Sequence, residues 1–154
     1  MAKAAIPKLI EANLVNFLNN EGWNSAPLAT AYESLGAQLP TMPFIRVEVD
    51  QGTEQPEHRG NYTVSVNVTA YGGLDPANDG NYSDITTNHS EVCGNIHESL
   101  VSELSNSDLE NTATGFTGSL TVYDIRLGGF NRTIDTGNGV FEDVWSLEIY
   151  CMLP

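Results

Sequence analysis

Residues 119–127, SLTVYDIRL, and residues 140–153, VFEDVWSLEIYCML, decide the fold class of this chain. In the second stretch, apolar residues recur at every other position from Trp145 to Cys151, which is the period of a strand with one buried face. The first stretch alternates in the same way, so we predict two long paired strands. Residues 128–139 form a polar, glycine-punctuated connection, longer than the roughly two to five residues usual for a hairpin. We therefore expect this connection to project as an arm.

Upstream of this pair, the spacing of apolar residues predicts a helix, two strands and a second helix. Residues 6–20 have helical spacing, with Pro7 suited to a first turn. Residues 44–49 and 62–70 alternate as strands, and residues 50–60 between them are predicted to form a turn or an excursion from the sheet. The second helix is expected over residues 83 to about 105.

The predicted fold is α+β, in a single domain that spans residues 1–154. Its elements follow the order α-β-β-α-β-β, and they form a mainly antiparallel sheet with helices packed on one face. The segment between the first helix and the first strand is expected to be loop, because it contains Pro27, Gly36, Pro40 and Pro43.

The chain is strongly acidic, with 20 Asp and Glu residues against six Lys and Arg residues and a formal net charge of −14. Such a surface repels phosphate, which argues against sequence-specific nucleic-acid binding. The acidity suits either simple solubility or a wall that nucleic acid passes without sticking. No apolar run approaches the ~20 residues that span a bilayer, so no membrane partner is expected. Residues 1–20 lack the continuous apolar region of a signal peptide, which predicts residence in a cytoplasm with both cysteines reduced.

No catalytic motif is recognisable, so we expect neither an enzyme nor a bound cofactor or metal. The nearest candidate is a metal-dependent enzyme that uses His89, Cys93 and His97, which recur at every fourth position of the predicted second helix. Successive four-residue steps drift by about 40° around a helix, and His89 lies within the apolar stripe. A buried, hydrogen-bonded histidine is therefore the favoured interpretation. Residues 75–80, DPANDG, resemble the start of a calcium loop, but its third and twelfth positions lack ligands.

Two polar segments, residues 54–60 and residues 129–138, each contain one of the six positive side chains, Arg59 and Arg132. In an assembly of acidic copies, a scarce arginine can pair with a carboxylate of a neighbouring copy. The alternative is that both segments are ordinary surface loops. We predict that Arg59→Glu or Arg132→Glu weakens assembly and leaves the subunit folded.

The run PFIRVEV at residues 43–49, the run YTVSVNV at residues 62–68, the helix that follows and the long C-terminal hairpin resemble tailed-bacteriophage tail terminator and tail completion proteins. The resemblance covers nearly the whole chain as a pattern of elements, without a diagnostic short motif. It implies a ring of this chain, usually a hexamer, that caps the tail tube protein and offers a surface to the head connector or neck protein. Genomic DNA would pass through the lumen without specific binding. The protein would reside in the virion after synthesis in the bacterial host cytoplasm.

Ring assembly in such a family implies polar strand faces that a neighbouring copy covers. The candidates here are Thr63, Ser65, Asn67 and Thr69 on one strand, and Val144 and Tyr150 on another. A neck or head-completion protein of the same junction would show much the same pattern. An acidic DNA-mimic inhibitor of a DNA-processing protein is a competitor from a different class, although 17% charged residues is few for a mimic.

Overall fold

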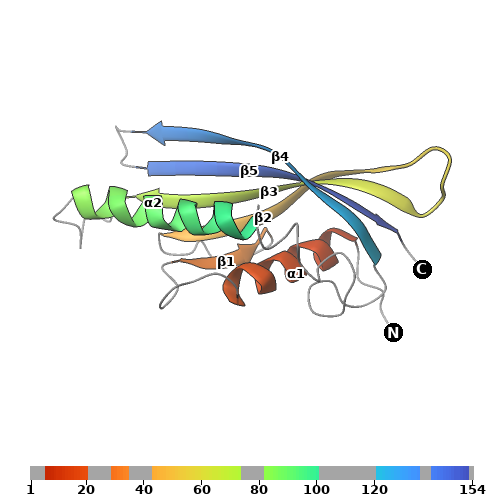
Figure 1. Ribbon diagram of the computed structural model, residues 1–154, viewed down its shortest axis with the longest axis horizontal. Coiled ribbons are helices and arrows are strands. Elements are labelled where there is room, and N and C mark those ends of the chain that lie inside the picture. The colour runs from red at the N-terminus through yellow and green to blue at the C-terminus, as the bar shows by residue number, and fades with distance from the viewer. Residues whose placement is uncertain are drawn as a thin grey trace.

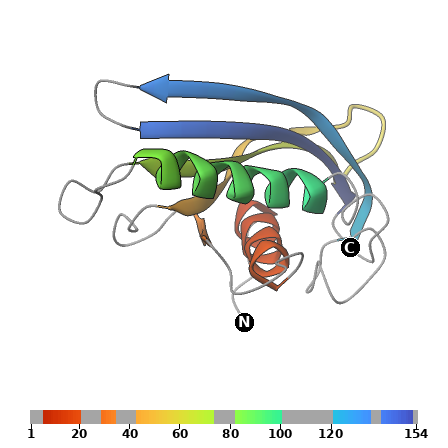
Figure 2. The same ribbon diagram turned by 60° about the vertical axis from the view of Figure 1, so that its left-hand side comes forward.

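The structure is a computed structural model that describes residues 6–20, 29–34, 43–73, 82–100, 121–135 and 140–152. The elements in chain order are α1 (Ile6–Asn20), β1 (Thr30–Glu33), β2 (Phe44–Glu54), β3 (Asn61–Gly73), α2 (Tyr82–Glu98), β4 (Thr121–Asp135) and β5 (Val140–Met152). The five strands form one sheet in the order β1-β2-β3-β5-β4 (Figure 1). Both helices lie on the same side of this sheet (Figure 2).

The strand β1 and the direction of its pairing correct the predicted fold class. The order is α-β-β-β-α-β-β rather than α-β-β-α-β-β, because a short strand forms inside the predicted loop. β1 pairs parallel with β2, while the other three pairings are antiparallel, so the sheet is mixed. The predicted α+β class is therefore wrong: the described chain is mostly strand, in one mixed five-stranded sheet with two helices.

Polar side chains of α1 hold β1 in place. Asn19 Nδ2 donates to the Ala31 carbonyl at 3.2 Å, and Asn19 Oδ1 accepts the Ala31 N–H at 2.8 Å. The buried carboxylate of Glu11 accepts the Ser34 N–H at 2.9 Å and the Val49 N–H at 3.1 Å. Because these partners are 12 to 38 positions apart in the chain, no local sequence pattern indicates the strand.

One hydrophobic core lies between the helices and the sheet. The prediction of a first helix over residues 6–20 is confirmed, and α1 buries Ile10, Leu14 and Phe17. α2 buries Val92 and Ile96 in the same core. Fully burying one such side chain stabilises the fold by roughly 1.5–3 kcal/mol. The sheet contributes every second residue of its central strands, namely Val64, Val66, Val68, Leu147 and Ile149.

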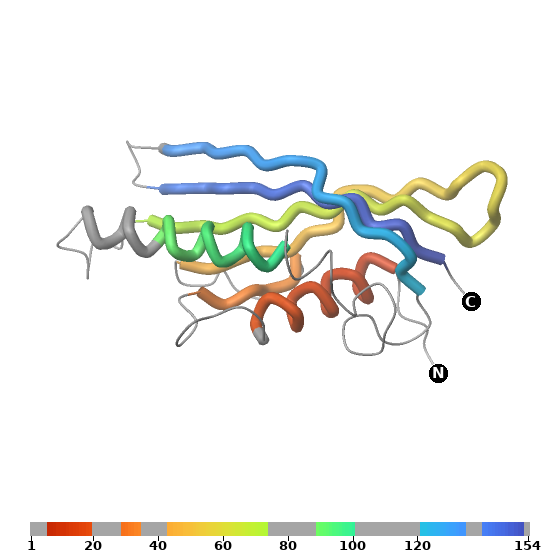
Figure 3. Tube along the Cα trace, viewed as in Figure 1, coloured from red at the N-terminus to blue at the C-terminus, as the bar shows by residue number. Residues whose placement is uncertain are grey.

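The β2–β3 hairpin extends beyond the rest of the sheet (Figures 1 and 3). The alternation predicts that β2 ends at residue 49, but the strand passes through an irregularity and continues to Glu54. Residues 50–54 are all exposed. The turn spans residues 55–60, where Gly60 has a φ of 81°, a left-handed conformation that favours glycine. The arm of this molecule is therefore the β2–β3 hairpin.

The β4–β5 hairpin shows that the arm predicted at residues 128–139 is wrong. β4 continues past Gly128 to Asp135 and stays paired with β5 over this length. A bulge next to Gly129, whose φ is 151°, absorbs the glycines without ending the strand. Only residues 136–139 separate the two strands, and they lie outside the described residues.

Some predictions fall where the structure gives no description. The predicted continuation of the second helix beyond residue 100 and the calcium-like loop at residues 75–80 both lie outside the described ranges. Within those ranges, neither helix has the length and hydropathy needed to cross a bilayer.

Candidate functional site

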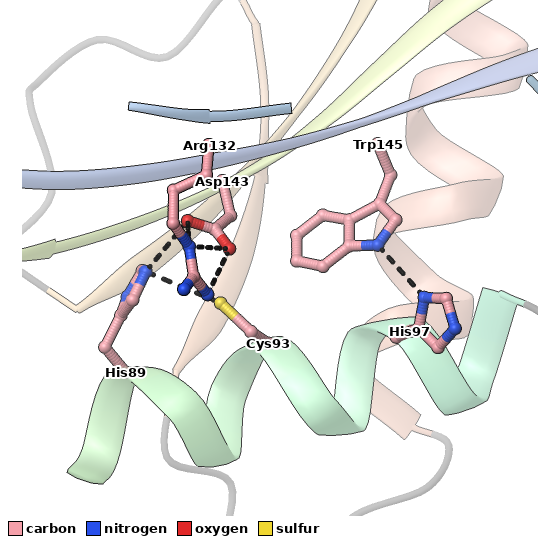
Figure 4. Close-up of polar contacts among 6 residues, drawn as sticks. All are labelled: His89, Cys93, His97, Arg132, Asp143 and Trp145. Atoms are coloured by element: carbon pink, nitrogen blue, oxygen red, sulfur yellow. Dashed lines mark hydrogen bonds and ion pairs between the residues drawn. The ribbon is translucent and has the colours of Figure 1, made fainter. Parts of the chain in front are cut away.

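A polar cluster, buried except for the exposed Arg132, lies between α2 and the β4–β5 hairpin (Figure 4). It consists of His89 and Cys93 from α2, Arg132 from β4 and Asp143 from β5. His89 Nε2 lies 3.4 Å from Asp143 Oδ1 and 3.4 Å from Cys93 Sγ. Arg132 Nε donates to both Asp143 oxygens at 3.0 Å, and Arg132 Nη2 donates to Oδ2 at 2.8 Å. The carboxylate is thus the centre of the cluster.

Local geometry explains why these four residues meet. His89 and Cys93 are four positions apart in α2, so their side chains lie one turn apart on the same face of the helix. Asp143 continues the buried alternation of β5 back from Trp145, which places its carboxylate on the face that α2 covers. Arg132 is the direct cross-strand partner of Asp143 in the β4–β5 register.

The imidazole of His89 has little room to move. A Cβ atom on residue 72 would lie 2.5 Å from His89 Nδ1, so Gly72 is the residue that leaves space for this ring. The ring of Phe141 packs beside it, with the two centroids 5.4 Å apart. Nδ1 is buried and has no hydrogen-bond partner among the described residues. The ring is therefore fixed with Nε2 directed at Cys93 and Asp143.

Burial and the guanidinium of Arg132 determine the protonation states of the cluster. Burial raises the pKa of Asp143, but hydrogen bonds from Arg132 and His89 and the charge of Arg132 outweigh it, so the net pKa falls below 3.8. Burial, and after it the charge of Asp143, raises the pKa of the Cys93 thiol to about 12. The hydrogen bonds to Asp143 raise the pKa of Arg132. The cluster is therefore an ion pair beside a protonated thiol, which is not an activated nucleophile.

A small pocket opens beside the cluster. Its volume is about 90 Å³, which is well above the space that one water molecule requires. It is smaller than the roughly 300 Å³ at which sites for organic ligands begin. Its size therefore suits water or an ion better than an organic substrate. The pocket is lined by His89, Ser90, Arg132, Ile134, Phe141 and Asp143.

The cluster contains two of the three residues that the sequence suggested as a metal-dependent site. The structure brings His89 and Cys93 together but leaves His97 apart, where its Nδ1 accepts a hydrogen bond from Trp145 Nε1 at 3.4 Å. Asp143 takes the third place, because its carboxylate and the ligand atoms of His89 and Cys93 all lie within 4.8 Å of one another. A signal for Asp143 is present in the sequence, as a charged residue on a strand face that is otherwise apolar.

The predicted interface residues of β3 and β5 lie on the sheet face opposite to the helices. This face contains Thr63, Ser65, Asn67, Thr69, Val144 and Tyr150. Thr63 is the cross-strand neighbour of Tyr150, and Ser146 Oγ donates to Asn67 Oδ1 at 3.3 Å. No described helix covers this face. Arg59 lies exposed in the turn of the β2–β3 hairpin. The part of these residues in an interface stays a prediction.

Arg132 differs from the other predicted interface residues. It lies within β4 rather than in a loop, and its partner is Asp143 of the same chain, with Nη2 2.8 Å from Oδ2. Arg132→Glu would replace this ion pair with two adjacent carboxylates. The substitution is therefore expected to destabilise the subunit itself, which corrects the expectation that folding is unaffected.

The edge of the sheet at β4 carries an apolar surface. β4 is the last strand in the sheet order, so one side of its backbone pairs with no described strand. Leu127, Phe130 and Ile134 project from its helix-side face and are 36%, 74% and 49% exposed. We call these three residues the β4 edge stripe. α2 approaches the stripe through His97, whose ring centroid lies 6.2 Å from that of Phe130. A long, unpaired edge with exposed apolar side chains is a surface for association.

Comparison with known proteins identifies no relative from which a function could be inferred. No protein-family model matches the chain, and a search of curated proteins finds no match.

Proposed function

We propose that this protein is a structural virion protein of a tailed bacteriophage that forms a ring at the junction of head and tail. The ring, a hexamer in the leading form of the proposal, terminates the tail tube and joins it to the head connector, with DNA passing through the lumen. A neck or head-completion protein of the same junction is the variant of this proposal. In both forms the protein acts by assembling with its own copies and with its neighbours, without catalysis.

The β4 edge stripe is the observation that carries the proposal. β4 is an edge strand of 15 residues, and the side of it that no described strand pairs with presents backbone donors and acceptors to a second chain. Covering three large apolar side chains gains free energy through burial of apolar surface, and an exposed aromatic residue such as Phe130 is a common anchor of interfaces. The other edge strand, β1, has only four residues, and the amide of Asn19 occupies backbone groups of Ala31. The two edges therefore differ in their capacity to bind a partner.

A ring requires a heterologous contact, in which one surface of a subunit meets a different surface of the next. The molecule offers such surfaces: the β4 edge stripe, the polar sheet face that no described helix covers and the projecting β2–β3 hairpin. The stripe and the polar face belong to opposite sides of the same sheet. Contact between different surfaces allows a ring to close without a two-fold axis.

The charge of the chain supports the passage of DNA. A net charge of −14 repels the phosphate backbone, so DNA in a lumen lined by such subunits would slide without being held. The buried cluster offers no activated nucleophile, which favours a structural role over a catalytic one. The virion location and the tail tube and head connector as partners follow from the resemblance of the element pattern.

The test is the native mass of the purified chain, measured by light scattering, together with negative-stain images of the same sample. Six copies of a 16.7 kDa subunit weigh about 100 kDa, and images should show a ring with a central hole. A monomer that assembles into rings only on tail tubes also supports the proposal. A monomer that binds no tail tube overturns it and favours the acidic DNA-mimic inhibitor.

A pair of variants tests whether the stripe carries the assembly. Phe130→Ser removes the most exposed large apolar side chain of the stripe and should abolish or weaken ring formation. Met152→Ser is the matched control, because Met152 is also exposed but lies at the far end of β5. Both variants should keep the thermal stability of the original chain. Equal loss of assembly in both variants would remove the stripe from the proposal.

A further inference from the structure

The buried cluster has the spacing of a tetrahedral metal site. In such sites zinc lies about 2.0–2.3 Å from nitrogen, oxygen and sulfur ligands, which places neighbouring ligand atoms about 3.3–3.7 Å apart. The distances from His89 Nε2 to Asp143 Oδ1 and to Cys93 Sγ are both 3.4 Å. The ligand atoms of all three residues lie within 4.8 Å of one another. Two edges of a coordination tetrahedron are thus already formed.

We propose that His89, Cys93 and Asp143 bind one divalent cation of the zinc class between α2 and β5. One nitrogen, one sulfur and one carboxylate oxygen are a donor set that suits zinc, whereas magnesium and calcium prefer oxygen ligands alone. When the cation binds, Cys93 loses its thiol proton to the solvent and the sulfur coordinates as a thiolate. The His89 imidazole takes the tautomer with its proton on Nδ1, so that Nε2 can coordinate. The fourth ligand is a water molecule, for which the adjacent 90 Å³ pocket has room.

The histidine is held ready for this role. Gly72 leaves the space that Nδ1 occupies, and the Phe141 ring limits rotation of the imidazole. Nε2 therefore points at the other two ligands before any cation is present. Such preorganisation is what a binding site needs to avoid rearranging a packed core.

Arg132 is compatible with the cation and also competes with it. Nη2 of Arg132 donates to Asp143 Oδ2 at 2.8 Å, and Nε donates to both oxygens at 3.0 Å. A cation on Oδ1 would therefore displace the Nε hydrogen bond to Oδ1, while Oδ2 keeps its hydrogen bonds. Ligating carboxylates are usually hydrogen-bonded in this way by an outer residue. The Arg132 side chain is 55% exposed, which allows the guanidinium to retreat toward solvent. A bound cation would tie α2 to β5 whatever larger assembly the chain forms.

The first experiment is a titration of the metal-free full-length chain with Co²⁺, followed by absorption spectroscopy. One equivalent should produce visible bands of tetrahedral cobalt and a near-ultraviolet charge-transfer band from the Cys93 thiolate. Cys93→Ser should lose the near-ultraviolet band, and Asp143→Asn should bind roughly tenfold more weakly or worse. His97→Gln is the control on the same helix and should bind as the original chain does. Absence of the thiolate band, or its survival in Cys93→Ser, overturns the proposal.

A second experiment distinguishes a cluster that binds a metal ion from a cluster in which Arg132 is the only cation that pairs with Asp143. Arg132→Met removes the competing cation and leaves Asp143 as a buried carboxylate in need of a positive partner. Zn²⁺ should raise the melting temperature of this variant by more than it raises that of the original chain. A melting temperature that Zn²⁺ leaves unchanged in both proteins overturns the proposal. Neither readout depends on ring formation.

Discussion

The β2–β3 and β4–β5 hairpins share a pattern of residue types but have different surroundings. In both, alternating strands lead into a polar segment that contains glycine. The β2–β3 strands continue beyond the core, and residues 50–54 are exposed on an arm. β5 stays over the core, with one buried face from Phe141 to Cys151, and β4 stays paired with it. Glycine and polarity therefore do not by themselves tell a projecting segment from a paired one.

What separates the two hairpins is the partner available to each polar side chain. Arg132 lies opposite Asp143 across the β4–β5 ladder, and α2 places His89 next to the same carboxylate. This network holds the polar half of β4 in the sheet. Arg59, at the tip of the β2–β3 hairpin, is exposed to solvent. A polar stretch thus stays with the body of the fold where the neighbouring elements satisfy its charges.

The largest difference is expected when the same substitution is made in both hairpins. Arg132→Glu removes the cation that pairs with buried Asp143 and should cost about 3 kcal/mol of unfolding free energy. This is the lower end for a broken buried pair, because more than half of the Arg132 side chain is exposed. Arg59→Glu should change stability by less than about 0.5 kcal/mol. Urea unfolding of both variants measures the difference, and equal midpoints would contradict the contrast between the hairpins.

A smaller difference is expected between two glycines within the β2–β3 hairpin itself. Gly72→Ala places Cβ 2.5 Å from His89 Nδ1, and the resulting overpacking should cost about 2 kcal/mol. Gly52 lies on the arm, where a Cβ meets only Val64 Cγ2 at an ordinary 3.6 Å. Gly52→Ala should therefore be neutral or stabilising by about 0.5 kcal/mol. Thermal melts of the two variants provide the test, and destabilisation by Gly52→Ala would mean that the arm is tightly packed.

Glu11 should control where the β2–β3 hairpin leaves the core. Its carboxylate accepts the Val49 N–H at the irregularity that precedes the arm. Glu11→Gln keeps the shape but weakens charge-assisted hydrogen bonds, at a cost of about 1 kcal/mol. Hydrogen exchange should become faster at Ser34 and Val49 and stay unchanged at Val68 in the centre of β3. Unchanged exchange at all three amides would show that Glu11 does not determine where the β2–β3 hairpin leaves the core.

The smallest effect is expected where the two hairpins touch. Gln55 Nε2, at the start of the β2–β3 turn, donates to the Tyr123 hydroxyl of β4 at 2.8 Å. Because this hydrogen bond is exposed, Tyr123→Phe should cost only about 0.5 kcal/mol. A double-mutant cycle with Gln55→Ala isolates the pair. A coupling energy near zero would show that the arm and β4 are energetically independent.

Periodic segments are the part of the fold that the sequence predicts well. The bounds of α1 and the alternation of β3 follow from apolar spacing, because burial on one face requires a period of 3.6 or 2. In β4, the sequence pattern predicts the wrong buried face near Val122, because a bulge there changes the alternation of buried and exposed residues. Val122 and Ile125 are buried while Tyr123 is exposed, although simple alternation groups Tyr123 with Ile125. Bulges depend on the partner strand, which no local window contains.

The candidate site also combines residues that the sequence indicates with residues that only the tertiary structure brings together. His89 and Cys93 are recognisable as neighbours because four positions make about one helical turn. His97 extends that pattern in sequence but bonds to Trp145 instead. Asp143 is visible as a charge on an apolar strand face, yet its contact with α2 depends on how the helix packs on the sheet. The pairing of Arg132 with Asp143 follows from the β4–β5 register. The sequence did not predict this pairing, because the segment with Arg132 was interpreted as a loop.

The sequence by itself determined the amphipathic elements, the acidic charge and the helical spacing of His89 and Cys93, because each depends on residues within a few positions of one another. Only the tertiary structure decided that β1 exists, that β2–β3 forms the arm and that Asp143 completes the cluster. β1 depends on hydrogen bonds with the side chains of Asn19 and Glu11, and the cluster depends on a contact between His89 and Asp143, which are 54 positions apart in the chain. These features arise from hydrogen bonds and ion pairs between distant segments, and such contacts exist only after the core has brought the segments together.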